Sequence, residues 1–242
     1  LHRLQQVPLA HASADTPPAL PSPSSDTARP SPWRDAAFRR LLAVFMLNGV
    51  ASAVPATLLP FFVADRLQAP DWQPLLLAGY FGAAALGLPL WVRLVARRGL
   101  APTWRIGMVA SVAAFAATPL LDAGDGALFL LICLASGLAL GADLALPGAL
   151  LTGVIHQAGA GRQGEGGYIG WWTFAAKLNL ALAAGVALPL LAAVGYSAGA
   201  TDPAALQALA LAYGGLPCLL KLAAAALLWR TERIHPAWRA TA

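Results

Sequence analysis

Six long apolar runs, each separated from the next by a short polar break, decide what this chain can fold into. A bilayer core of about 30 Å needs about 20 apolar residues to cross it as a helix. The runs are residues 41–64, 74–96, 104–121, 127–155, 168–194 and 205–229. The breaks are rich in Gly, Pro and Asp, and only 11% of the 242 residues are charged, against roughly 25% in soluble domains. We therefore predict an all-α membrane protein with six transmembrane helices in a bundle spanning residues 34–230.

The two ends of the chain lie outside these runs. Residues 1–33 are rich in Pro and Ser and lack the charged start and apolar core of a signal peptide, so we predict a flexible linker. Residues 231–242 form a short tail. Because the chain opens without Met on linker-like sequence, we expect a fragment or the second half of a longer protein.

The distribution of arginine predicts the orientation. If the linker is cytoplasmic, eleven arginines lie at the cytoplasmic ends of the runs and one, Arg66, lies outside. The cytoplasmic set is Arg34, Arg39, Arg40, Arg93, Arg97, Arg98, Arg105, Arg162, Arg230, Arg233 and Arg239. We expect a multi-pass protein of the inner (plasma) membrane with both termini cytoplasmic. The net charge of +5 comes from residues that flank the runs rather than form one basic face, which argues against a nucleic-acid partner.

Three ionisable residues lie inside the runs, where charge is costly and usually faces a cavity or a partner. Asp143 is the one formal charge between Gly126 and Gly161. From the helical rise of ~1.5 Å, Asp143 lies about 18 Å and Lys177 about 13 Å from the cytoplasmic ends of their runs. We predict an Asp143–Lys177 ion pair or a shared polar network. The alternative is that Asp143 caps or hydrogen-bonds a neighbouring helix in a structural role.

Lys221 lies about 12 Å from the cytoplasmic end of the last run, within reach of the interface for a long side chain, so we expect it to extend there. Asn48 and Asn179 also lie within runs, where hydrogen bonding between helices is their expected role. Together with Asp143 and Lys177, these three are the candidate residues of a transport pathway or gate.

The sequence motifs do not support an enzyme activity. The sequence lacks a Ser/His/Asp set, a G-x-x-x-x-G-K-[ST] loop and an H-E-x-x-H pair, so we predict no catalytic residues. Cys133 and Cys218 lie inside apolar runs at a spacing that fits no metal site, and we predict that they pack as small apolar residues. No metal or bound cofactor is expected.

Several motifs resemble, in order, the C-terminal half of the glycoside–pentoside–hexuronide:cation symporters, the relatives of melibiose permease within the major facilitator superfamily. They are "FRRLLAVFMLNGVASAVPATLLPFFVADRL", "GLPLWVRLVARRGLAPTW", "GADLALPGALL", "EGGYIGWWTFAAKLNLALAAGVALPLL" and "YGGLPCLLKLAAAALL". The resemblance covers about residues 34–230 and places Lys177 at the family's intramembrane lysine.

The resemblance implies one six-helix half of a major facilitator bundle that moves a sugar together with Na⁺ or H⁺ by alternating access. It implies an N-terminal six-helix half as partner, in the same longer chain or separate, which carries the cation site. It also implies cytoplasmic gate loops, here represented by Arg93, Arg97, Arg98, Arg162 and Glu165. Gly153 and His156 stand where family members often have carboxylates.

Two other functions stay open. The low polarity of the runs is compatible with a major facilitator carrier of another substrate class, such as an exporter of drugs or lipids. A membrane protein that no longer transports is the other alternative, because the first half is not in this sequence.

Overall fold

The structure is a computed structural model that describes residues 31–193, 195–235 and 238; at 161–163, 188 and 190 it describes the backbone alone. The predicted linker therefore lies almost wholly outside the described residues, as do the last residues of the predicted tail.

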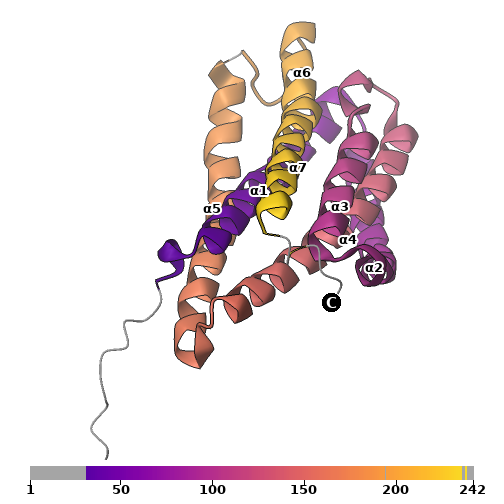
Figure 1. The fold of residues 1–242 in the computed structure, drawn as a ribbon. Coiled ribbons are helices and arrows are strands. Elements are labelled where there is room, and N and C mark those ends of the chain that lie inside the picture. The colour runs from indigo at the N-terminus through magenta and orange to yellow at the C-terminus, as the bar shows by residue number, and fades with distance from the viewer. Residues whose placement is uncertain (1–30, 194, 236–237, 239–242) are drawn as a thin grey trace, which may run out of the picture.

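Six helical segments are long and apolar enough to cross a membrane, and together they form a single bundle (Figure 1). The spans run over Ala36–Arg66, Pro70–Arg98, Leu100–Leu120, Gly126–Gln157, Gly164–Ala193 and Pro203–Ile234. The six predicted spans are confirmed. The sixth extends further than predicted, because residues 231–234 continue its helix instead of starting the tail.

The described residues form seven α-helices and five short helical turns, of which η1 lies just before the first span. The α-helices are α1 (Ala36–Phe61), α2 (Gln73–Arg98), α3 (Leu100–Phe115), α4 (Gly126–Gln157), α5 (Gly161–Ala193), α6 (Pro203–Ala210) and α7 (Leu216–Ile234). The 3-10 turns are η1 (Pro32–Arg34), η3 (Pro70–Trp72) and η4 (Thr118–Leu120), and the π-helical turns are η2 (Phe62–Arg66) and η5 (Leu211–Gly215).

Local sequence explains where the helices begin and end. The Asp35 side chain accepts from the backbone N–H of Ala37 and caps α1, and Asp202 caps α6 in the same way through Ala205. Between α2 and α3 a single residue, Gly99, makes the turn with φ of 84°, a conformation that glycine adopts without strain. The polar breaks thus act as caps and turns, as their composition predicts.

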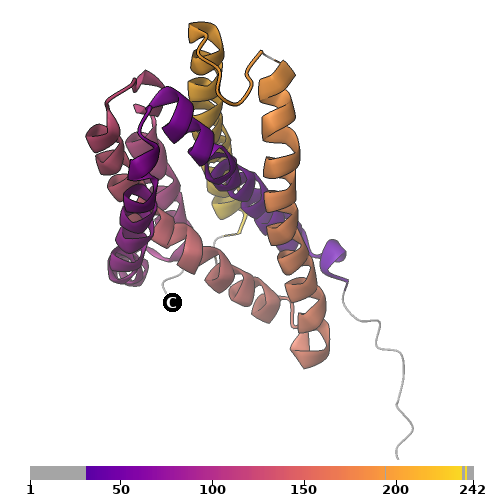
Figure 2. The same ribbon diagram turned by 180° about the vertical axis from the view of Figure 1, so that it is seen from behind.

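The packing is symmetric when the first three spans are exchanged with the last three. The first helix, α1, packs on α5 and α7, the second and third spans of the other triplet; α4 packs on α2 and α3 in the same way. Figure 2 shows α1 crossing α5 obliquely, while the last turns of α4 lean out towards the start of α5. Because each triplet has three spans, the two run in opposite directions through the membrane. This is the inverted-repeat arrangement found within each half of major facilitator transporters.

Glycine allows α2 and α4 to approach closely. A Cβ at Gly137 would lie 2.3 Å from the backbone oxygen of Tyr80, and one at Gly141 would lie 3.0 Å from that of Ala84. Gly87 on α2 is equally tight, since a Cβ there would lie 2.9 Å from the backbone oxygen of Leu138. Small residues at such contacts are how membrane helices pack without a large hydrophobic driving force.

Two apolar clusters divide the bundle along its length. We call the end with residues 31–35, the α2–α3 turn and Ile234 the terminus end, and the end with residues 66–72, 118–125 and 195–202 the loop end. The terminus-end cluster is centred on Phe38, Leu41 and Trp104. The loop-end cluster is centred on Leu58, Phe62 and Phe129. In Figure 1 the loop end is at the top.

Candidate functional site

A closed polar network lies at mid-depth, between the two apolar clusters. Lys221 Nζ donates to Asp143 Oδ2 at 2.6 Å and to Asn48 Oδ1 at 3.0 Å. Asn48 Nδ2 donates to Asp143 Oδ1 at 3.0 Å, and Trp104 Nε1 donates to the same oxygen at 2.9 Å. Four helices, α1, α3, α4 and α7, each contribute one residue. We call these four residues the polar network.

The network makes charge tolerable inside the bundle. The Lys221 and Asp143 side chains are 8% and 10% exposed, so neither can rely on bulk water. A buried ion pair is tolerated only if the geometry is close and further hydrogen bonds support it; here Asn48 bonds to both members and Trp104 donates to Asp143. As a unit the network carries no net charge.

The predicted Asp143–Lys177 ion pair is wrong: the partner of Asp143 is Lys221, and the side chain of Lys177 is exposed. The reason is in the packing, because α4 packs mainly on α2 and α3 whereas α5 packs on α1. The expectation that Lys221 extends to the interface is also wrong. The last span continues to Ile234, 13 residues beyond Lys221, which puts this lysine about 20 Å from the helix end.

The two asparagines differ. Asn48 joins the polar network, as a residue that hydrogen-bonds between helices was expected to do. Asn179 on α5 is 4% exposed and packs against α1, where a Cβ at Gly49 would lie 1.9 Å from Asn179 Nδ2. Its Oδ1 has no hydrogen-bond partner among the described residues. Asn179 therefore serves the contact between α1 and α5 in this structure.

Trp104 is the member of the network that sequence reasoning missed. It is fully buried, and its indole N–H is a donor that must find an acceptor when buried. A tryptophan inside an apolar run, one helical turn after the turn at Gly99, was the available signal.

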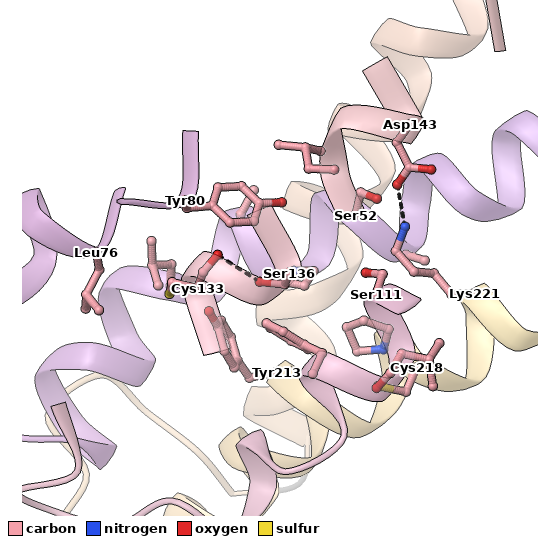
Figure 3. Close-up of a pocket in the computed structure, with 18 of the residues that line it drawn as sticks. Ser52, Leu76, Tyr80, Ser111, Cys133, Ser136, Asp143, Tyr213, Cys218 and Lys221 are labelled. Atoms are coloured by element: carbon pink, nitrogen blue, oxygen red, sulfur yellow. Dashed lines mark hydrogen bonds and ion pairs between the residues drawn. The ribbon is translucent and has the colours of Figure 1, made fainter. Parts of the chain in front are cut away.

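A cavity of about 310 Å³ extends from the polar network towards the loop end (Figure 3). It is lined by residues of α1, α2, α3, α4 and the last span, and so lies between the two triplets. Asp143 and Lys221 form one end of it, with Ser52 and Ser111 beside them. Tyr80 and Tyr213 line the part further from the ion pair, and Tyr213 belongs to the π-helical turn η5.

At the terminus end, polar contacts connect side chains that are far apart in the sequence. Arg105 on α3 pairs with Glu232 on α7 at 3.0 Å, and Arg40 on α1 contacts His235 at 2.8 Å. Four residues predicted for the gate loops, Arg93, Arg97, Arg98 and Glu165, are exposed at this end and make neither of these two contacts. The side chain of the fifth, Arg162, lies outside the described part of the chain.

An ion pair and several hydrogen bonds connect the loops at the loop end. Arg66 pairs with Asp122 at 2.7 Å and donates to the backbone oxygen of Leu121. Asp65 accepts from the Tyr196 hydroxyl and from the backbone N–H of Gly199. Burial, together with the hydrogen bond and the charge of Asp65, raises the pKa of Tyr196 above its ordinary value. Three loops that are far apart in the sequence are thereby held together over the cavity.

Within the described residues, no group of three or more His, Cys, Asp or Glu side chains lies close enough to hold a metal ion. Cys133 and Cys218 are free thiols in the wall of the cavity. The chemistry that this site offers is binding through an ion pair, hydroxyls and apolar surface.

The chain has six apolar spans, two triplets of spans that pack on each other in the same way, and an ion-pair network that faces a mid-depth cavity. These features together are those of a polytopic membrane carrier. A family model described as MFS/sugar transport protein matches residues 30–232, most of the chain. The chain belongs to this family of the major facilitator superfamily. It is therefore a major facilitator transport protein. A comparison with curated proteins finds no match.

Proposed function

We propose that this chain is the C-terminal half of a secondary active transporter that moves a sugar, or a related glycoside, pentoside or hexuronide, together with a cation by alternating access. The family description and the ordered motifs of the glycoside–pentoside–hexuronide:cation symporters support this assignment. In this proposal the N-terminal six-helix half supplies the site for Na⁺ or H⁺. The protein lies in the plasma membrane, with both ends of this chain on the cytoplasmic side.

The observation that carries the proposal is the exposed side chain of Lys177 at mid-depth. Lys177 lies 13 residues after Gly164 and 16 before Ala193, near the centre of its span. A lysine facing lipid at that depth costs at least ~2.5–3.5 kcal/mol, so such residues face a bundle interior or a water-filled path. None of the residues that the structure describes covers Lys177, which favours a second half on that side of α5 with the solute path between them.

Transport in vesicles from cells that express the chain together with its upstream coding region tests the proposal. We expect uptake of a radiolabelled disaccharide that stops when the Na⁺ or H⁺ gradient is dissipated. Lys177→Gln should lower that uptake about tenfold or more with the amount of protein unchanged, because a polar group of the path is lost. Full uptake in Lys177→Gln, or no further spans encoded upstream and no partner chain, would refute it.

A carrier of apolar solutes is the second candidate, favoured by the mostly aliphatic and aromatic wall of the cavity. The same vesicles separate the two candidates. Efflux of an apolar dye without disaccharide uptake would support this alternative.

A further inference from the structure

The cavity inside this half has a chemistry of its own, which the transport proposal does not use. It lies between the two triplets of one half, and none of the described side chains of α5, the helix that carries Lys177, lines it. Its volume of about 310 Å³ is at the lower end of the range of about 300–1,000 Å³ for small-molecule sites. A ligand could therefore occupy it whether or not a second half is present.

The polar end of the cavity is electrically neutral. A lysine ammonium has three donors, of which Lys221 uses two, and an ionised carboxylate has about four acceptor positions, of which Asp143 uses three. One donor and one acceptor remain. An additional charge placed here would have no opposite charge to match it, and burying an unmatched charge is strongly unfavourable.

Two serine hydroxyls extend this polar end. Ser52 lies one helical turn after Asn48 on α1, and Ser111 lies on α3, two turns after Trp104 (Figure 3). Neither hydroxyl has a hydrogen-bond partner among the described residues, so each can both donate to and accept from a ligand. These groups suit a hydroxyl or carbonyl of an uncharged molecule.

The rest of the cavity is apolar and has a mouth. Leu59, Leu76 and Phe115 line it further towards the loop end. Ala56 on α1 and Phe81 on α2 also line it but are exposed, and Phe81 is 59% exposed. The cavity therefore opens between α1 and α2 at membrane depth, where an apolar molecule can enter from the bilayer or from the interface with another half.

We propose that this cavity binds an uncharged amphiphile, with its hydroxyl or carbonyl end at Asp143, Lys221, Ser52 and Ser111 and its apolar body along Leu59, Leu76 and Phe115. The polar end fixes the orientation and excludes carboxylates and ammonium ions. The apolar body supplies most of the contact area. Binding of this kind needs neither an ion gradient nor transport.

A photoreactive octanol that carries a diazirine tests the proposal on the full chain in phosphatidylcholine nanodiscs. After irradiation, peptide mapping by mass spectrometry should place label on the cavity walls, on residues 76–81 or 111–115. Excess 1-octanol should compete, whereas octanoate and octylammonium should compete about tenfold less well, since each brings an unmatched charge. Label spread over lipid-facing residues such as Leu86, or equal competition by octanoate, would overturn the proposal.

Two cavity variants, the first with a matched control, complete the test. Ser111→Phe fills the cavity and should lower cavity labelling about tenfold, while Ala113→Phe, two residues away on the exposed side of α3, should leave it unchanged. If Ser111→Phe does not fold, Ser52→Ala should weaken competition by octanol about two- to tenfold through loss of one hydrogen bond. Unchanged labelling in a folded Ser111→Phe, or unchanged competition in Ser52→Ala, would contradict the site. Because binding alone is measured, failure of sugar transport leaves this result unaffected.

Discussion

The terminus end and the loop end of the bundle are built from the same six spans, yet they are packed differently. At the terminus end, Leu41, Trp104 and Met108 are fully buried in a continuous cluster. At the loop end the cluster surrounds a cavity, and both π-helical turns of the described residues occur there. The polar network lies at the boundary between the two ends. Similar apolar composition therefore produces a closed end and a hollow end, and the backbone irregularities occur where the hollow is.

The largest effect is expected where the two ends meet. Lys221→Gln leaves Asp143 as a buried charge without its partner and should lower the free energy of unfolding by about 3–5 kcal/mol. Asp143→Asn should cost a similar amount. The double variant should cost clearly less than the sum of the two, because it leaves no unpaired charge. Unfolding in mixed micelles, followed by circular dichroism, measures all three.

Lys177→Gln is the matched control for this prediction, since the same substitution is made on an exposed side chain. It should not lower the free energy of unfolding, because no described side chain pairs with Lys177 and a neutral amide at that depth is less costly than a lysine. Strictly additive losses for Asp143 and Lys221, or a loss at Lys177 as large as at Lys221, would contradict the pairing.

Truncation of a leucine should destabilise the protein more at the terminus end than in the cavity wall, and this difference should be smaller than that for the ion pair. Leu41→Ala at the terminus end removes contacts on all sides and should cost about 2–5 kcal/mol. Leu140→Ala, in the cavity wall, should cost less than about 2 kcal/mol, because a side chain that faces a void has fewer contacts to lose. Equal losses measured in the same unfolding assay would mean that the cavity is filled by side chains.

Enlarging a residue should also cost more stability at the terminus end than at the cavity. A Cβ at Gly107 would lie 2.5 Å from the Cβ of Ala142, so Gly107→Ala at the terminus end should cost about 1–3 kcal/mol through overpacking. Ala56→Val at the mouth of the cavity should be neutral within about 0.5 kcal/mol. Gly185→Ala, where a Cβ meets nothing within 4 Å, controls for helix propensity and should stabilise by about 0.5–1 kcal/mol. Destabilisation by Ala56→Val as large as by Gly107→Ala would contradict this comparison.

The smallest effect on stability is expected for the hydrogen bonds that connect the loops at the loop end. Because the pKa of Tyr196 is raised in the folded state, its contribution is present below the ordinary tyrosine value of about 10 and is lost as pH rises above it. The wild-type unfolding midpoint should therefore fall more steeply above pH 10 than that of Tyr196→Phe. At neutral pH the variant should lose about 0.5–1.5 kcal/mol with its hydrogen bond to Asp65. Parallel pH profiles would contradict the role of Tyr196.

The fold was predictable from the sequence because a membrane restricts the choice of structure. Each span is evident from its length and apolarity, and the breaks between spans carry the caps and turns. The close approach at Gly137 and Gly141 also follows from a stretch of small residues. The two π-helical turns were not predictable, since neither FVADR nor LAYGG carries a residue pattern that is specific to a wider helical turn.

Three of the four residues of the polar network were predictable from the sequence, but Trp104 and the pairing were not. Asp143, Lys221 and Asn48 were all expected as polar groups at depth, yet the partner of Asp143 was misassigned. Depth along a helix follows from residue number, but which helices face each other follows from the packing of all six. A span end placed five residues too early was enough to move Lys221 towards the interface.

The exchange-symmetric packing has a consequence for the order of assembly during synthesis. The neighbours of α4 precede it in the chain, whereas two neighbours of α1 follow it. Asp143 is made 78 residues before Lys221, which at about 5–20 residues per second is an interval of roughly 4–16 s. During that interval, Trp104 and Asn48 have already been synthesised and can donate to Asp143 Oδ1. The two neutral members of the network are thus available as partners of the acidic residue before its basic partner is synthesised.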